Sequence, residues 1–160
     1  MDTHDPREDP APDPITEGVV AGMAMQVLLA TRALQPVKAR DALSKLITEH
    51  GDLFAVAFAV WCDEAIDSIA DVTSDNDDAA ELIQCICAIE EEGGPERRWA
   101  GRILWARAAD DRDAFIACLR EANTLDSDER YERITALLAT AATTVASCDQ
   151  LRERARAFHV

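Results

Sequence analysis

The sequence lacks lysine and arginine over a long central segment. Neither residue occurs between Lys45 and Arg97, although the same segment contains fourteen acids, from Glu49 to Glu96. The whole chain has 31 Asp and Glu against 16 Lys and Arg, which gives a formal net charge of −15. A field of this sign repels nucleic acid and anionic lipid and attracts basic surfaces. The composition therefore argues against direct binding to nucleic acid or a membrane and favours a basic protein partner.

Residues that commonly build catalytic sites are scarce. Only His4, His50 and His159 are present, no serine lies in a nucleophile motif, and no glycine-rich phosphate loop occurs. Cys85 and Cys87 are two apart, and on a helix such residues point about 200° from each other, so they cannot ligate one zinc ion. The primary interpretation therefore has no catalytic residue, no metal and no cofactor.

Long apolar runs and a signal peptide are also missing. The two longest apolar stretches, 18–31 and 53–62, are shorter than the roughly 20 residues that a membrane span needs, and the N-terminus is acidic and rich in proline. The five cysteines are an odd number and lie mostly in apolar helical runs, as is typical of reduced thiols in the cytosol. We expect a cytoplasmic protein, and the preference for arginine over lysine indicates a bacterial source.

Aromatic residues make up only 5% of the chain and alanine is abundant, a composition that favours packed helices over a sheet. Residues 1–14 combine prolines with acids and are predicted to be a disordered acidic tail. Residues 15–160 are predicted to form one all-α domain, a compact bundle of seven or eight antiparallel helices. Apolar periodicity and helix-ending residues place these helices at 16–34, 37–50, 53–72, 78–92, 95–109, 111–122 and from 127 onward, with 149–160 continuing the last helix or forming a separate one.

The helix predicted at 53–72 is expected to be the centre of the fold. Its first half, Leu53 to Cys62, has no polar side chain on any face, which predicts that it is covered on all sides and is the most buried stretch. Asp52 is expected to cap this helix, and Ser127 to cap the last helix. Trp61 and Trp99 lie on the apolar arcs of their helices and are predicted to be core residues.

The last predicted helix carries an apolar seam about five turns long, and a homo-oligomer could form through this 131–148 seam. Its residues recur at alternating spacings of three and four, namely Tyr131, Ile134, Leu138, Ala141, Val145 and Cys148.

Acidic residues recur at helical spacing on two consecutive predicted helices. Glu64, Asp67 and Asp71 are three and four apart, so their carboxylates lie on one helical face, and Asp78 and Glu81 do likewise on the next helix. Two such faces could hold Mg²⁺ between them, because a hard cation prefers oxygen ligands. Solvent-facing acids together with a helix cap explain the same residues without a metal.

The order Asp63-Glu64-x-x-Asp67 followed by Asp78-x-x-Glu81 resembles the all-α nucleotide pyrophosphohydrolases over about residues 60 to 90. In that family, acidic pairs on consecutive helices bind magnesium and the phosphates of the substrate. The resemblance implies a Mg²⁺ site formed by Glu64, Asp67, Asp78 and Glu81. This sequence departs from the family pattern by exchanging glutamate and aspartate within the pairs, by a short connection, and by the absence of a base from residue 46 to 96.

We favour a non-enzymatic helical interaction protein, an adaptor or inhibitor that binds a basic partner through an acidic face. One specific form of this hypothesis is a nucleic-acid mimic that occupies the groove of a DNA-binding protein. The alternative is a Mg²⁺-dependent enzyme similar to the pyrophosphohydrolases, and a third possibility is that the acids only keep the protein soluble. The residues predicted to bind the partner are Asp63, Glu64, Asp67, Asp71, Asp77, Asp78 and Glu81.

Overall fold

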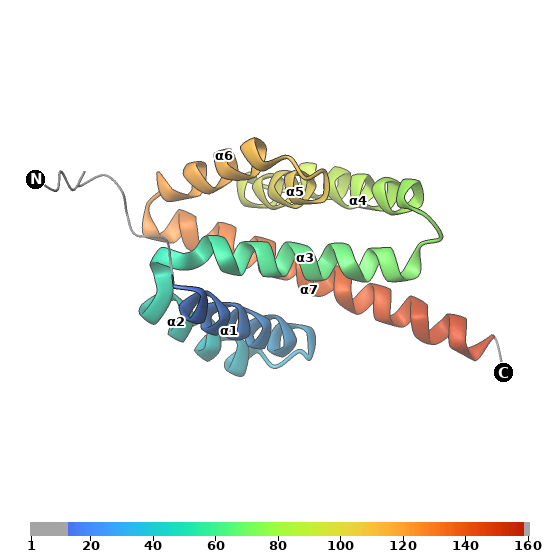
Figure 1. Ribbon diagram of the computed structural model, residues 1–160, viewed down its shortest axis with the longest axis horizontal. Helices are drawn as coiled ribbons and strands as arrows, with labels where there is room; N and C mark the ends of the chain where they lie inside the picture. The colour runs from blue at the N-terminus through green and yellow to red at the C-terminus, as the bar shows by residue number, and fades with distance from the viewer. Residues whose placement is uncertain (1–12, 159–160) are drawn as a thin grey trace, which may run out of the picture.

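The computed structural model describes residues 13–158, and over that range every regular element is a helix, which confirms the all-α prediction (Figure 1). The elements in chain order are α1 (Pro14–Arg32), α2 (Pro36–His50), the short 3-10 helix η1 (Gly51–Leu53), α3 (Phe54–Val72), α4 (Asn76–Glu91), α5 (Pro95–Ala108), α6 (Arg112–Asn123) and α7 (Ser127–Ala157).

The two ends of the helical region differ in part from the prediction. Asp13 accepts a hydrogen bond from the Ile15 amide and Pro14 occupies the first helical position, so α1 begins two residues before the expected Thr16. The rest of the predicted acidic tail, residues 1–12, lies outside the described residues. At the other end, α7 continues without a break to Ala157, so the described part of 149–160 is not a separate helix.

The helices are arranged around two long central elements, α3 and α7, which pack along each other (Figure 1). The α1–α2 pair lies on one side of them, and α4, α5 and α6 lie on the other. Both α3 and α7 run from the same end of the molecule toward the end where the C-terminus lies. The antiparallel bundle is therefore not confirmed, because the two central helices, α3 and α7, run in the same direction.

The core forms where α3 and α7 meet α1 on one side and α5 on the other. Trp61 on α3 and Trp99 on α5 are both 0% exposed, which confirms that they are core residues. The Trp61 Nε1–H donates to the Ala24 carbonyl of α1 at 2.9 Å, and the Trp99 Nε1–H donates to the Cys118 carbonyl of α6 at 3.0 Å. Phe58 packs between the two, its ring centroid 6.0 Å from that of Trp61 and 5.4 Å from that of Trp99. The aromatic cluster thus joins four helices, and its indole N–H groups are satisfied.

The prediction that Leu53 to Cys62 is the most buried stretch is wrong. Ala55 is exposed, and only Ala57, Phe58, Trp61 and Cys62 in that stretch are buried. The middle of α5 is more completely buried, whereas the first half of α3 leaves the side that carries Ala55 exposed. The buried residues of α5 are Trp99, Ala100, Gly101, Ile103, Leu104 and Ala106.

Both predicted helix caps are also wrong. Asp52 lies within η1, and α3 starts after Leu53 with no side-chain cap, because the 3-10 turn leads directly into the helix. At α7 the cap is one residue earlier than expected: the Asp126 carboxylate accepts a hydrogen bond from the Glu129 amide at 2.8 Å, and Ser127 is already helical.

Two glycines in α1 offer a stability prediction. Gly18 and Gly22 are exposed, and a Cβ added to either would meet no atom within 4 Å. We expect Gly18→Ala and Gly22→Ala each to raise the free energy of unfolding by up to about 1 kcal/mol, since alanine costs less conformational entropy in a helix. Chemical denaturation would measure this. Gly101→Ala is the control, because its Cβ would lie 3.2 Å from that of Glu90; equal gains at all three positions would contradict the argument.

Candidate binding surfaces

Two of the seven acids predicted to bind a partner are neutralised within the chain. Asp63 forms two hydrogen bonds with Arg107 of α5, at 2.8 and 2.9 Å, and Asp71 contacts Arg152 of α7 at 3.3 Å. The Arg107 contact raises the pKa of that guanidinium. Asp63 and Asp71 therefore tie α3 to later helices, and their inclusion in a free acidic face is corrected.

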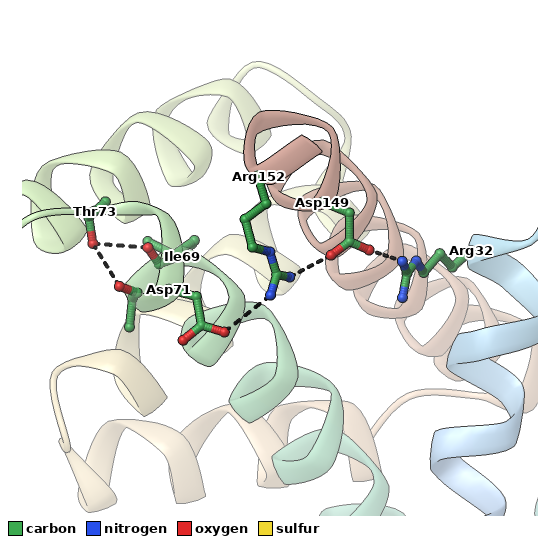
Figure 2. A network of polar contacts seen from close by, with 7 residues as sticks. Arg32, Ile69, Asp71, Thr73, Asp149 and Arg152 are labelled. Atoms are coloured by element: carbon green, nitrogen blue, oxygen red, sulfur yellow. Dashed lines mark hydrogen bonds and ion pairs between the residues drawn. The ribbon is translucent and has the colours of Figure 1, made fainter. Parts of the chain in front are cut away.

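Arg152 belongs to a larger ionic network at the end of α3 (Figure 2). Its guanidinium lies between Asp71 of α3 and Asp149 of its own helix, and Asp149 also contacts Arg32 of α1. Close by, the Thr73 hydroxyl donates to the Ile69 carbonyl at 2.9 Å and closes the last turn of α3. The network fastens α1, α3 and α7 together at the end where the two central helices finish.

The negative charge of the segment without lysine or arginine is thus partly compensated by arginines from other segments of the folded chain. In addition to the pairs of Asp63 and Asp71, Glu90 accepts a hydrogen bond from the Arg97 Nε–H at 3.1 Å, which connects α4 to the start of α5. The arginines that pair with acids of this segment, Arg97, Arg107 and Arg152, all follow residue 96 in the chain. Sequence reasoning missed this because charges counted along a chain do not show which helices face each other.

The other five predicted acids have no ion-pair partner among the described residues. Four of them are exposed, and Glu64 is half-buried. The acids of α4 lie at a capped helix start. The Asp75 carboxylate caps α4 by accepting a hydrogen bond from the Asp78 amide at 2.8 Å. We call these five residues the unpaired acids: Glu64, Asp67, Asp77, Asp78 and Glu81.

The magnesium site implied by the resemblance is not assembled. Within residues 13–158 no three His, Cys, Asp or Glu side chains lie close enough to hold a metal ion. The physical reason is the packing of α4, which lies mainly along α5 and makes little contact with α3, so the acidic faces of α3 and α4 do not converge. The alternative in which Glu64, Asp67, Asp78 and Glu81 share one ion is therefore not supported by the described residues.

A large apolar groove lies between α4 and α7, and no sequence prediction anticipated it. Its volume is about 900 Å³. On the α4 side, Ile89 is 60% exposed, and Leu82 and Ile86 are only half-buried. We call this the α4–α7 groove, and its lining is Ile69, Leu82, Ile86, Ile89, Glu90, Glu96, Arg97, Glu132, Thr135, Ala136, Ala139, Thr140, Thr143, Thr144, Ser147, Cys148 and Leu151.

The α7 seam packs mostly inside the chain. All of its predicted members except Tyr131 are buried, most of them in the main core, and Tyr131 is 44% exposed. These buried residues are not available to a second copy. A homo-oligomer through residues 131–148 therefore stays a prediction for the side of α7 that lines the groove. The signal that could have located that side is a second stripe of small residues at spacings of three and four, which are Ala136, Ala139, Thr143 and Ser147.

Helix α1 is long and apolar enough to cross a membrane. The apolar stretch 18–31, on which the sequence prediction was based, is too short by itself. The helix also contributes Val20, Ala24 and Val27 to the core, and core helices of proteins in solution pass the same test. The cytoplasmic location stays a prediction.

The thiols give a prediction for alkaline pH. Burial is the main cause that raises the pKa of Cys62, and the neighbouring Asp63 adds to it; burial also raises the pKa of Cys87 to about 11. The folded protein therefore holds these protons after the unfolded chain has lost them. Stability should fall as pH rises from the ordinary thiol pKa of 9.0 through the folded values.

The melting temperature of wild type and of Cys62→Ala between pH 8 and 11 measures this effect. We expect the variant to show the shallower fall with pH, whatever the loss of packing does to its absolute stability. The exposed Cys85 offers the control, and Cys85→Ala should keep the wild-type slope. Identical slopes for wild type and Cys62→Ala would contradict the prediction.

Comparison with known proteins finds no matching family model, no matching curated protein and no matching solved structure.

Proposed function

We propose that this chain is a non-enzymatic helical interaction protein, an adaptor or inhibitor, which binds a basic partner protein through the unpaired acids of α3 and α4. The observation that supports it is that some acids form ion pairs within the chain and others do not. Arginines of later helices pair with Asp63, Asp71 and Glu90, yet within the described residues none pairs with the unpaired acids.

Acids without a nearby cation destabilise the fold by repelling one another, but they also attract a basic partner. Asp77, Asp78 and Glu81 repel one another at the start of α4, and only the helix dipole offsets part of that repulsion. A field of one sign attracts cationic partners and raises their rate of association, most strongly at low ionic strength. A protein that used acids only for solubility would gain as much from charges dispersed among bases.

The partner is expected to present a contiguous basic surface. One such surface is the groove of a DNA-binding protein, whose lysine and arginine side chains meet phosphates at regular spacing. Carboxylates held on a rigid helix can occupy the same positions, and in that case this chain would compete with DNA for the partner.

The test is capture of partners from the native host at low and at high salt. We expect basic proteins to be retained at low salt and released as the screening length falls below roughly 10 Å. The matched variant converts the unpaired acids to Gln or Asn and should recover far less of the same proteins. Recovery of partners that are not basic, or equal recovery by the variant, would show that these acids are only a solvated surface.

A further inference from the structure

We propose that the α4–α7 groove is the docking site for an amphipathic helix of the partner, with apolar residues on one side of that helix and lysine or arginine on the other. This inference deepens the proposed function and rests on it. The occupant is a helix of the basic partner and not a second copy of this chain.

The lining of the groove has the pattern of a helix-binding surface. One wall is the apolar row Leu82, Ile86 and Ile89 of α4, which repeats every three or four residues. These side chains remain half-buried or exposed although they are large and apolar, and covering them would remove apolar surface from water. A helix that lays an apolar stripe into such a groove covers the row along its length.

The opposite wall allows close approach. Along α7, Ala139, Thr143 and Ser147 are four residues apart, and all three are exposed and small. A ridge of short side chains lets a neighbouring helix pack at the small end of the usual 8–10 Å interaxial range. The hydroxyls on this wall need no partner in the bound state, since a helical Thr or Ser can donate to the carbonyl four residues earlier, as Thr144 does to Thr140 at 2.8 Å.

The length of the groove fits a helix rather than a small molecule. Its lining on α7 extends from Glu132 to Leu151, which at about 1.5 Å per residue is roughly 28 Å along the axis. An amphipathic helix of about 18 residues has the same length. Both Ile89 on α4 and Leu151 near the end of α7 are about half exposed or more, so they are available as anchor contacts.

Charge selects the occupant. The charged residues of the lining are Glu90, Glu96, Glu132 and Arg97, and the one cation is already bonded to Glu90. Glu96 and Glu132 therefore leave the rim acidic, and a docked helix with basic residues at its edges would meet both. A second copy of this chain would instead bring a further net charge of −15 to the same rim, which opposes self-association.

The experiment uses three labelled peptides of about 18 residues and the full chain, with binding measured by fluorescence anisotropy. The first peptide places leucine at helical spacing and lysine elsewhere, the second has the same composition with the leucines scattered, and the third replaces lysine by glutamate. We expect the first to bind at least about tenfold more tightly than either of the others, because only it matches both the apolar wall and the acidic rim.

A pair of variants separates docking from simple attraction. Thr143→Glu puts a carboxylate on the groove wall, and Gln150→Glu puts one on an exposed position of α7 outside the groove. Docking predicts that Thr143→Glu weakens the lysine–leucine peptide at least about tenfold, because a charge must be desolvated, and that Gln150→Glu leaves binding the same or slightly tighter. Non-specific electrostatic binding predicts that both variants tighten it.

Several outcomes would overturn the inference. These are no saturable binding, equal binding of the scattered or glutamate peptide, or undiminished binding by Thr143→Glu when its circular dichroism and melting match those of Gln150→Glu. A dimer in sedimentation that Thr143→Glu abolishes would show that the occupant is a second copy. In any of these cases, partners that still depend on the unpaired acids would leave the proposed function standing and remove the groove alone.

Discussion

Replacing Trp99 by alanine should lower the free energy of unfolding by about 3–5 kcal/mol, the range for removing a large aromatic side chain from a packed core. Trp99 is fully buried on α5, the helix that touches α3, α4, α6 and α7. The change removes the edge contact with Phe58 and also leaves the Cys118 carbonyl without its indole donor. A loss of this size is a large fraction of the roughly 5–15 kcal/mol that stabilises a typical domain, so the variant should unfold at a clearly lower temperature than wild type.

Two further variants calibrate this result. Trp105→Ala removes the same side chain from the same helix where it is 38% exposed, so it should cost much less. Trp99→Phe keeps an aromatic ring but removes the donor to Cys118, and should fall between the two. Urea denaturation with a common slope compares all three. Equal destabilisation by Trp99→Ala and Trp105→Ala would contradict the placement of the core.

Neutralising the unpaired acids should slow association with the captured partner about 10- to 100-fold at low salt, while changing the dissociation rate little. The reason is that long-range attraction acts on the encounter of the two proteins, whereas short-range contacts govern how long the complex lasts. The substitutions are Glu64→Gln, Asp67→Asn, Asp77→Asn, Asp78→Asn and Glu81→Gln.

The matched control neutralises the paired acids. Asp63→Asn and Asp71→Asn remove the partners of Arg107 and Arg152, and each should lower stability by up to about 1 kcal/mol, as expected for a solvent-exposed ion pair. Association should also slow, since each change removes one negative charge, but it should slow less per charge, because the proposed contact with the partner is made by the unpaired acids and not by these two carboxylates. Stopped-flow kinetics at several salt concentrations and urea denaturation measure the two effects. Equal slowing per charge removed in both sets would show that pairing within the chain does not determine which acids act.

The sequence was sufficient for the properties that depend on local pattern. Apolar periodicity placed most helices within a few residues, and the apolar arcs of Trp61 and Trp99 identified two central core residues. Gly93-Gly94-Pro95 ended one helix and began the next, and α5 starts at Pro95 as expected.

What the sequence did not show depends on contacts between distant segments. The pairing of Asp63 with Arg107 requires knowing that α5 packs on α3. The exposure of Ala55 and Ile89 depends on which sides of α3 and α4 other helices cover. The groove likewise depends on how α4 and α7 lie relative to each other. Ile89 on α4 belongs to an apolar pattern that is typical of a buried face, but it lines the groove. Periodicity gives the apolar side of a helix but does not tell whether the rest of the chain covers it.

The most direct test of the central claim is hydrogen–deuterium exchange of the chain with and without the partner captured at low salt. The unpaired acids lie on the second half of α3 and the first half of α4. Binding through them predicts slower exchange in the peptides that cover residues 62–82, with little change in α1 and α2. Protection confined to α1 and α2, with exchange at 62–82 the same in the free and bound protein, would contradict the account.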